Sequence, residues 1–178
     1  PELRRHAKVI NFGIIYGMGP YSLSQDLGIS QAMAKTYIDN YFNHYPGVKA
    51  FIDQTIETAR RTKQTSTLMG RIRLLPDIDS RNHNVRQFAE RTAVNTPIQG
   101  TAADLIKLAM IAVDRHIRET PYQANMLLSV HDEIVLEVPA EEIAPVSAMV
   151  RSTMEGIWDL AVPLNVNLAV GDDWNEAH

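Results

Sequence analysis

Residues 125–138 read NMLLSVHDEIVLEV, and this stretch decides the fold class. Two apolar runs, Asn125 to Val130 and Ile134 to Val138, flank the polar apex His131-Asp132-Glu133. The pattern predicts a buried antiparallel hairpin that presents carboxylates at its tip. Because most of the chain before it has helical patterns, the sequence predicts an α+β fold.

Helical spacing of apolar residues fills most of the chain on both sides of this hairpin. The expected helices cover residues 4–16, 22–27, 30–44, 48–63, 82–95, 100–118 and 141–158. A shorter hairpin is expected over residues 65–75, turned by Met69-Gly70, and a last strand over residues 165–170. Pro97 is expected to stop the helix that precedes it. The chain therefore divides into a helical part, residues 1–95, and a mixed part, residues 96–178.

The composition is that of an ordinary globular protein. The 178 residues are 45% hydrophobic and 21% charged, which argues against a disordered or collagen-like chain. No stretch approaches the roughly 20 apolar residues of a membrane span, and no basic-then-apolar leader opens the chain. The count of 0 Cys excludes disulfides and thiolate metal sites. These features predict a cytoplasmic protein without a membrane partner.

The charges are distributed unevenly along the chain. Residues 1–118 carry a net charge of +6, and residues 119–178 carry a net charge of −10. A basic part favours a polyanionic partner such as nucleic acid, although ordinary solvated surfaces would also explain the pattern. Eight cations fit contacts with a nucleic-acid backbone: Arg60, Arg61, Lys63, Arg71, Arg73, Arg81, Arg86 and Arg91.

Four side chains recur at four-residue spacing near the start of the chain: Arg4, Lys8, Phe12 and Tyr16. On a helix they share one side. Two cations one turn apart can hold a polyphosphate, and an aromatic ring one turn further on can pack on the sugar or base of the same nucleotide. The alternative is an amphipathic surface helix whose Phe12 and Tyr16 are core residues.

Two further sets of residues carry possible chemistry. Adjacent acids on extended backbone point to opposite faces, so Asp132 and Glu133 are not expected to bind one ion equally. One of them is expected to bind Mg²⁺ and the other to have an outer role, although a polar turn between core strands remains the alternative. The second set is Arg91, Asn95 and Gln99, whose donors suit the acceptors that all correct base pairs share in the minor groove. Ordinary helix-surface residues are the alternative for this set.

Three stretches resemble the motifs of the family A DNA polymerases. Residues 4–17, RRHAKVINFGIIYG, resemble motif B, and residues 130–133, VHDE, resemble motif C. Residues 90–104 are similar to the family segment that joins fingers to palm. The resemblance implies that residues 1–95 form fingers with a flanking hairpin. It implies that residues 96–178 form part of the palm.

The motif B resemblance implies roles in nucleotide binding. Arg4 and Lys8 would bind the triphosphate of the incoming dNTP, and Lys8 would also donate a proton to the departing pyrophosphate. Phe12 would lie against the sugar, and Tyr16 would lie beside the nascent base pair.

The motif C resemblance implies that Asp132 is the catalytic metal ligand, within a complete active site that holds two Mg²⁺ ions. Glu133 would be an auxiliary acid, and His131 would contact the primer near its end. The joining segment would supply three minor-groove contacts: Arg91, Asn95 and Gln99.

Nothing in the chain resembles motif A, which supplies another catalytic aspartate in this family. The sequence therefore predicts a C-terminal part of a DNA polymerase, inactive without an upstream portion that carries motif A and the thumb. Primer-template DNA and dNTP would be its other partners. Two alternatives stay open: a non-catalytic DNA-binding module on the same scaffold, and an unrelated Mg²⁺ phosphohydrolase.

Overall fold

The computed structural model describes residues 2–177, and side chains from Arg4 onward. The chain divides into two compact units, residues 1–100 and residues 101–178, which we call unit 1 and unit 2. The predicted boundary between residues 95 and 96 lies shortly before this division. None of the described helices is long and apolar enough to cross a bilayer.

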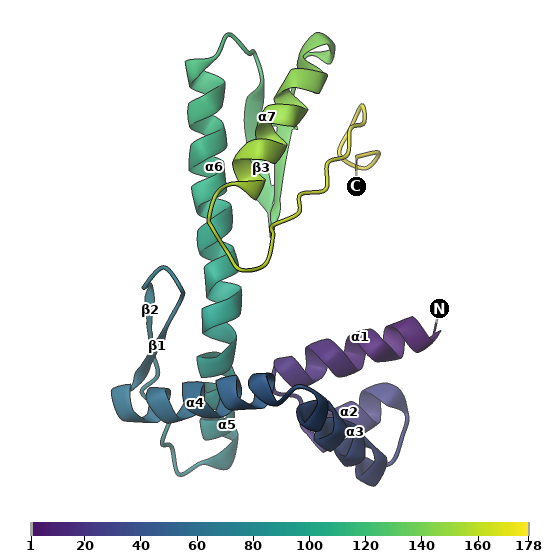
Figure 1. Ribbon diagram of the computed structural model, residues 1–178, viewed down its shortest axis with the longest axis vertical. Coiled ribbons are helices and arrows are strands. Elements are labelled where there is room, and N and C mark those ends of the chain that lie inside the picture. Colours follow the sequence, from purple (N-terminus) through teal and green to yellow (C-terminus); the bar gives the residue numbers. More distant parts are fainter. Residues whose placement is uncertain (1, 178) are drawn as a thin grey trace. The chain divides into compact units, whose positions relative to one another are not determined.

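Unit 1 is built mainly from helices (Figure 1). They are α1 (Glu2–Ile15), α2 (Pro20–Leu27), α3 (Gln31–His44), α4 (Pro46–Thr62) and α5 (His83–Asn95). Between α4 and α5, strand β1 (Gln64–Ser66) pairs antiparallel with β2 (Ile72–Leu74). The predicted short hairpin is therefore present, with strands shorter than the sequence pattern suggested.

Local capping explains where these helices begin. Helices α2 and α4 start at Pro20 and Pro46, two residues before the predicted starts. Proline is tolerated in the first turn because its missing N–H has no partner there in any case. The Ser30 hydroxyl caps α3 by accepting from the Met33 N–H at 3.2 Å, and the Asn82 side chain caps α5 in the same way.

The core of unit 1 lies where α4 and α5 meet the segment after the hairpin. It contains Ala59, Leu75, Ile78, Ala89 and Ala93. Alanines on both helices let their backbones approach closely. The buried Thr65 hydroxyl donates to the Ala93 carbonyl at 3.1 Å and so joins β1 to α5.

The sequence predicted that the helix stops before Pro97, but the helical path continues through this residue. Residues Thr96–Gly100 form a π-helical turn, and α6 (Thr101–Glu119) follows directly. Proline has no N–H and its ring clashes with the preceding turn of a regular α-helix. The wider π turn accommodates the ring without ending the helical path.

Unit 2 has a two-stranded sheet next to two helices (Figure 1). Strands β3 (Asn125–Val130) and β4 (Glu133–Glu137) pair antiparallel, which confirms the predicted hairpin. The prediction that this hairpin is buried is wrong for the described chain, because every residue of the two strands is exposed or half-buried. A 3₁₀ turn at Ala140–Glu142 leads into α7 (Ile143–Glu155). The core joins α6, α7 and the hairpin through Val113, Ala124, Val146 and Val150. The mixed helix and hairpin content confirms the predicted α+β class.

The predicted strand at residues 165–170 is wrong for the described chain, where no strand follows β4. The backbone there joins no sheet (Figure 1). The reason lies in its hydrogen bonds. The Val166 carbonyl accepts from Arg151 Nη1 at 2.9 Å, and the Val166 N–H donates to Glu155 Oε1 at 3.0 Å. Side chains of α7 thus take the groups that a neighbouring strand would have paired.

Candidate functional site

One side of α1 carries the four residues that the sequence singled out. Arg4, Lys8 and Phe12 are exposed, and Tyr16 is half-buried at the end of the helix. The rings of Phe12 and Tyr16 stack with centroids 6.4 Å apart and an angle of 17° between their planes. Because Phe12 is 49% exposed, its ring is not part of the core of unit 1. Within unit 1 the ring is therefore open to solvent on one side.

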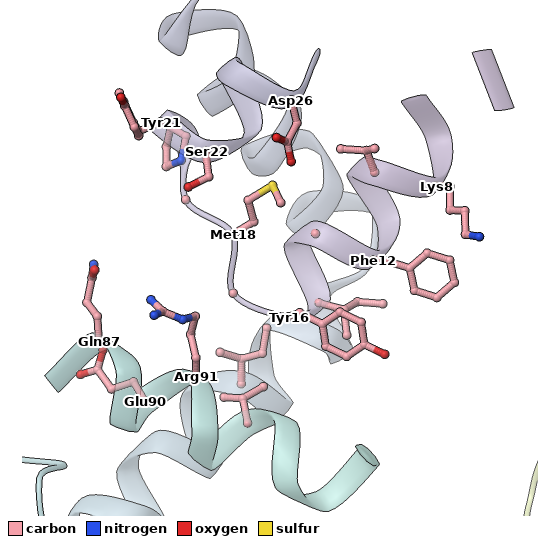
Figure 2. Close-up of a pocket in the computed structure, with 18 of the residues that line it drawn as sticks. Lys8, Phe12, Tyr16, Met18, Tyr21, Ser22, Asp26, Gln87, Glu90 and Arg91 are labelled. Atoms are coloured by element: carbon pink, nitrogen blue, oxygen red, sulfur yellow. The ribbon is translucent and has the colours of Figure 1, made fainter. Parts of the chain in front are cut away.

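An open hollow of about 1110 Å³ lies in unit 1, lined by α1, the loop after it, and residues of α2, α4 and α5. Figure 2 shows Lys8, Phe12 and Tyr16 projecting from one side of α1, while Arg91 rises from α5 beside the loop that follows α1. All four are lining residues. Arg4, Asn95 and Gln99 are not among the described lining residues. The structure thus brings together four of the seven candidates in unit 1.

A compact turn ends α1 directly after Tyr16. The Gly17 N–H donates to the Ile14 carbonyl at 3.0 Å, and the Met18 N–H donates to the Gly13 carbonyl at 2.8 Å. Gly17 has φ +83°, the left-handed conformation that glycine adopts without steric cost. This pair of bonds is the Schellman motif of helix C-termini. It sets the position of Tyr16 at the edge of the hollow.

The minor-groove candidates lie on α5 and the π turn. Arg91 and Gln99 are exposed, and Asn95 is half-buried. The Oδ1 atom of Asn95 is enclosed and has no hydrogen-bond partner, and such an orphaned acceptor costs about 1–3 kcal/mol. The helix itself is held against α4 by an ion pair between Glu90 Oε1 and Arg60 Nη2 at 2.6 Å.

The apex of the unit 2 hairpin presents the other candidates. Val130 pairs with Glu133, so His131 and Asp132 form a two-residue turn between the strands. His131 takes a left-handed conformation with φ +55°. His131, Asp132 and Glu133 are all exposed. The apex therefore offers an imidazole and carboxylates to solvent, as the sequence pattern predicted.

The carboxylates at the apex do not form a complete metal site on their own. Among residues 2–177, no group of three or more His, Asp or Glu side chains is arranged to hold a metal ion. Asp132 belongs to the turn, whereas Glu133 is the first residue of strand β4. The two carboxylates therefore start from backbone of different conformation. Carboxylate oxygen is the donor that Mg²⁺ prefers, so a metal ion at this apex would need further ligands from outside the hairpin.

Sequence reasoning missed two residues that line the hollow, Met18 and Glu90. Met18 packs on α1, with its Sδ atom 2.9 Å from where a Cβ on Gly13 would lie. Glu90 and Arg60 form the ion pair that fixes α5. Only Met18 had a local signal, because a glycine after a helical run predicts a Schellman turn with an apolar residue following it. The ion pair joins residues 30 positions apart, which no local pattern reveals.

Comparison with known proteins gives consistent matches along the chain. A model of DNA polymerase family A matches residues 1–176. The chain is 51% identical over 174 residues to DNA polymerase I of Streptococcus pneumoniae serotype 4, covering 98% of this chain and 20% of that protein. It is 49% identical over 176 residues to DNA polymerase I of Geobacillus stearothermophilus, covering 99% of this chain and 20% of the relative.

A solved structure is also similar. It is the POL domain of Pol1 from M. smegmatis in complex with DNA primer-template and dNTP, with a TM-score of 0.95 and 43% sequence identity. The match covers 99% of this chain and 31% of that chain. The chain thus spans about a fifth of the length of its curated relatives and less than a third of this polymerase domain.

Proposed function

This chain belongs to DNA polymerase family A, and from that membership we propose that it forms part of a template-directed DNA polymerase. The complete enzyme would add dNTPs to the 3′ end of a primer and release pyrophosphate. The observation that carries the proposal is the exposed cationic and aromatic side of α1 beside an open hollow. A similar domain was solved with DNA primer-template and dNTP, which supports the same choice of ligands.

The exposed side of α1 would bind the incoming nucleotide. Arg4 offers a planar fork of donors for phosphate oxygens, and Lys8 offers a point charge one turn away. The Phe12 ring, which is open to solvent, would pack against the sugar. Tyr16 would lie beside the new base pair, at the point where the glycine turn ends the helix.

Lys8 would serve both binding and chemistry. In the reaction, the primer 3′-hydroxyl gives its proton to a water molecule and its oxygen forms a bond to the α-phosphorus, while the bond from that phosphorus to the bridging oxygen breaks. Negative charge develops on the departing pyrophosphate. An ammonium group at hydrogen-bond distance can neutralise that charge and donate a proton to the leaving oxygen. Exposure of Lys8 at the hollow is consistent with this role.

Asp132 would provide one carboxylate to the metal site, with Glu133 as an auxiliary acid. Family A polymerases use divalent metal ions. Bound Mg²⁺ would neutralise charge on the transferring phosphate and favour the ionised 3′-oxygen. A pair of ions needs carboxylates beyond those at the apex of this hairpin. We infer that an upstream polymerase portion with motif A provides them, and that this chain is inactive without it.

Four residues would contact the DNA. His131 at the hairpin apex would approach the end of the primer. The donors of Arg91, Asn95 and Gln99 would test the minor groove, where acceptor positions are common to all correct pairs.

Complementation tests the proposed function directly. The purified 178-residue chain should give no primer extension, and it should gain extension when a separate polymerase portion with motif A and the thumb is added. Robust extension by the chain alone would contradict the proposed division of the active site. Tight primer-template binding without extension after complementation would instead favour a non-catalytic DNA-binding module.

A metal-ligand variant tests the assignment of Asp132. In the complemented enzyme, Asp132→Ala should abolish turnover and leave primer-template binding largely intact, because the lost carboxylate acts on the transition state. Asp159→Ala is the matched control, since Asp159 is an exposed acid in the same unit and should leave the rate unchanged. A near wild-type rate for Asp132→Ala would contradict the metal assignment.

A further inference from the structure

The Arg91 side chain contacts Gly17, which is otherwise exposed, on the side where a Cβ would lie. A Cβ on Gly17 would lie 3.0 Å from Arg91 Cγ and 3.5 Å from Arg91 Cδ. The aliphatic part of this arginine therefore lies directly on the turn that ends α1. In Figure 2 the Arg91 side chain rises from α5 beside the loop that joins α1 to α2. The guanidinium lies further out, and the residue as a whole is exposed.

Met18, which follows Gly17 in the turn, packs on α1. The Met18 side chain lies against Gly13, one turn back on α1, with its Sδ and Cε atoms 2.9 and 3.2 Å from where a Gly13 Cβ would be. Glycines at positions 13 and 17 thus make room for two longer side chains. Met18 belongs to the turn itself, whereas Arg91 belongs to a different helix.

Helix α5, which carries Arg91, is well packed in unit 1. Three of its residues, Ala89, Ala93 and Val94, are buried. The neighbour of Arg91, Glu90, forms the 2.6 Å ion pair with Arg60 of α4. The stem of Arg91 therefore starts from a well-packed helix and reaches the turn that ends α1. Among the described side chains of α1, Gly13 and Ile14 are buried.

We propose that Arg91 is a positioning residue whose aliphatic stem, packed on Gly17, holds the end of α1 and so fixes Tyr16 at the hollow. This assigns two separate roles to one side chain. The stem positions α1, and the guanidinium remains available to DNA. The effect on nucleotide use rests on the proposed function, while the packing role does not.

Three variants separate the stem from the charge. Arg91→Ala removes both, Arg91→Met keeps an aliphatic stem without charge, and Arg91→Lys keeps both stem and charge. Amide hydrogen exchange of Gly17 and Met18 in the purified chain should become roughly tenfold faster in Arg91→Ala. It should stay within about twofold of wild type in the other two variants. Gln87→Ala, an exposed lining residue one turn earlier on α5, is the control and should change nothing. Equal acceleration in Arg91→Met and Arg91→Ala would overturn the proposal.

A double-mutant cycle checks the contact itself. Gly17→Ala adds backbone strain and a Cβ that meets Arg91 Cγ. In the Arg91→Ala background the second effect disappears, so Gly17→Ala should lower the denaturation midpoint less there than in the wild-type chain. Strictly additive effects of the two substitutions would contradict the contact.

The complemented polymerase links the packing to nucleotide use. Arg91→Ala should raise the KM for dNTP at least threefold more than Arg91→Met does, while both variants weaken primer-template binding. Equal KM values in the two variants would overturn the positioning role. Failure of the wild-type complemented enzyme to extend primers would instead contradict the proposed function, and the exchange experiment would still decide the packing role.

Discussion

His131 has a backbone conformation that is uncommon among non-glycine residues. Its φ of +55° lies in the left-handed region, which only one other described non-glycine residue, Lys63, adopts. A residue with a Cβ pays about 1–2 kcal/mol there, and glycine does not. Such strain persists where the surrounding structure holds the residue in that conformation, and strained residues are concentrated at functional sites.

Two variants at this position separate the strain from the imidazole. His131→Ala and His131→Gly both remove the ring, so both should lose the same contact with the primer. His131→Gly should be more stable than His131→Ala by about 1 kcal/mol, because only alanine keeps the strain. Urea unfolding of the purified variants measures the difference. Equal midpoints would show that the turn relaxes in solution.

Phe12 gives a second prediction at the level of a single residue. Its ring is half exposed and stacks only on Tyr16 among the described aromatic rings, so an added hydroxyl would not be buried. Phe12→Tyr should supply a polar partner near the sugar 3′ position, where a dideoxynucleotide lacks its own hydroxyl. A hydrogen bond involving phosphate is worth about 1.5–3 kcal/mol.

Discrimination against dideoxynucleotides should therefore fall at least several-fold in Phe12→Tyr, with little change for normal dNTPs. The measurement is the ratio of dideoxy to deoxy incorporation by the complemented enzyme. An unchanged ratio together with a lower melting temperature would mean that Phe12 is a packing residue in the complete polymerase.

The residues that carry charge or aromatic rings on one face of α1 could be predicted from the sequence, because helical spacing alone sets that face. The contact between Gly17 and Arg91 could not. It depends on how α5 packs in unit 1, and the two residues are distant in the chain. Local periodicity indicates which residues share a helix face. It does not indicate which other helix supplies the side chain that packs on Gly17.

The β1–β2 hairpin packs closely on the π turn where Thr67 meets Gly100. A Cβ on Gly100 would lie only 2.7 Å from the Thr67 Cγ2 methyl. Gly100→Ala should therefore destabilise unit 1 by about 1–3 kcal/mol through overpacking. Thr67→Ser removes the methyl but keeps the hydroxyl that accepts from the Arg71 N–H. The double variant Gly100→Ala/Thr67→Ser should regain most of the lost stability in denaturant unfolding. Failure to regain it would assign the loss to backbone strain in the π turn.

The elements differ in how far their sequence determines them. The β3–β4 hairpin could be predicted because both strands and the turn lie within residues 125–138. The strand expected at residues 165–170 could not form, because a strand exists only with a partner and α7 side chains bind Val166 instead. At Pro97 the sequence indicated a disturbance correctly. The wider turn that absorbs it depends on packing around Thr96, which is buried.

The uneven charge distribution belongs to the whole molecule, and it predicts a strong salt dependence of DNA binding. Each phosphate contact releases counterions, so the logarithm of affinity falls with the logarithm of salt concentration by about 0.9 per contact. Some cations of the basic stretch already have acidic partners, such as Arg60 with Glu90 and Lys63 with Asp79.

Arg61 and Arg73 are exposed and have no ion-pair partner among the described residues. Replacing both with alanine should reduce the slope of primer-template binding against salt by about 2. Replacing Lys49, which is paired with Asp53 at 2.7 Å, should leave the slope nearly unchanged. Fluorescence anisotropy at several salt concentrations gives the slopes. Unchanged slopes for the Arg61 and Arg73 variant would place the DNA backbone elsewhere.

The segment at residues 165–170 has a consequence for handling the purified chain. Its backbone joins no sheet in the described chain, and Leu168 and Val170 are 36% and 61% exposed. Extended backbone with exposed apolar side chains is a template for aggregation between copies. Light scattering should therefore rise with protein concentration, and Asn167→Pro, which removes an N–H from the segment, should suppress the rise. A polymerase portion that covers this segment would also suppress the rise in light scattering. Low scattering would therefore show that the two portions have assembled before any nucleotide is added.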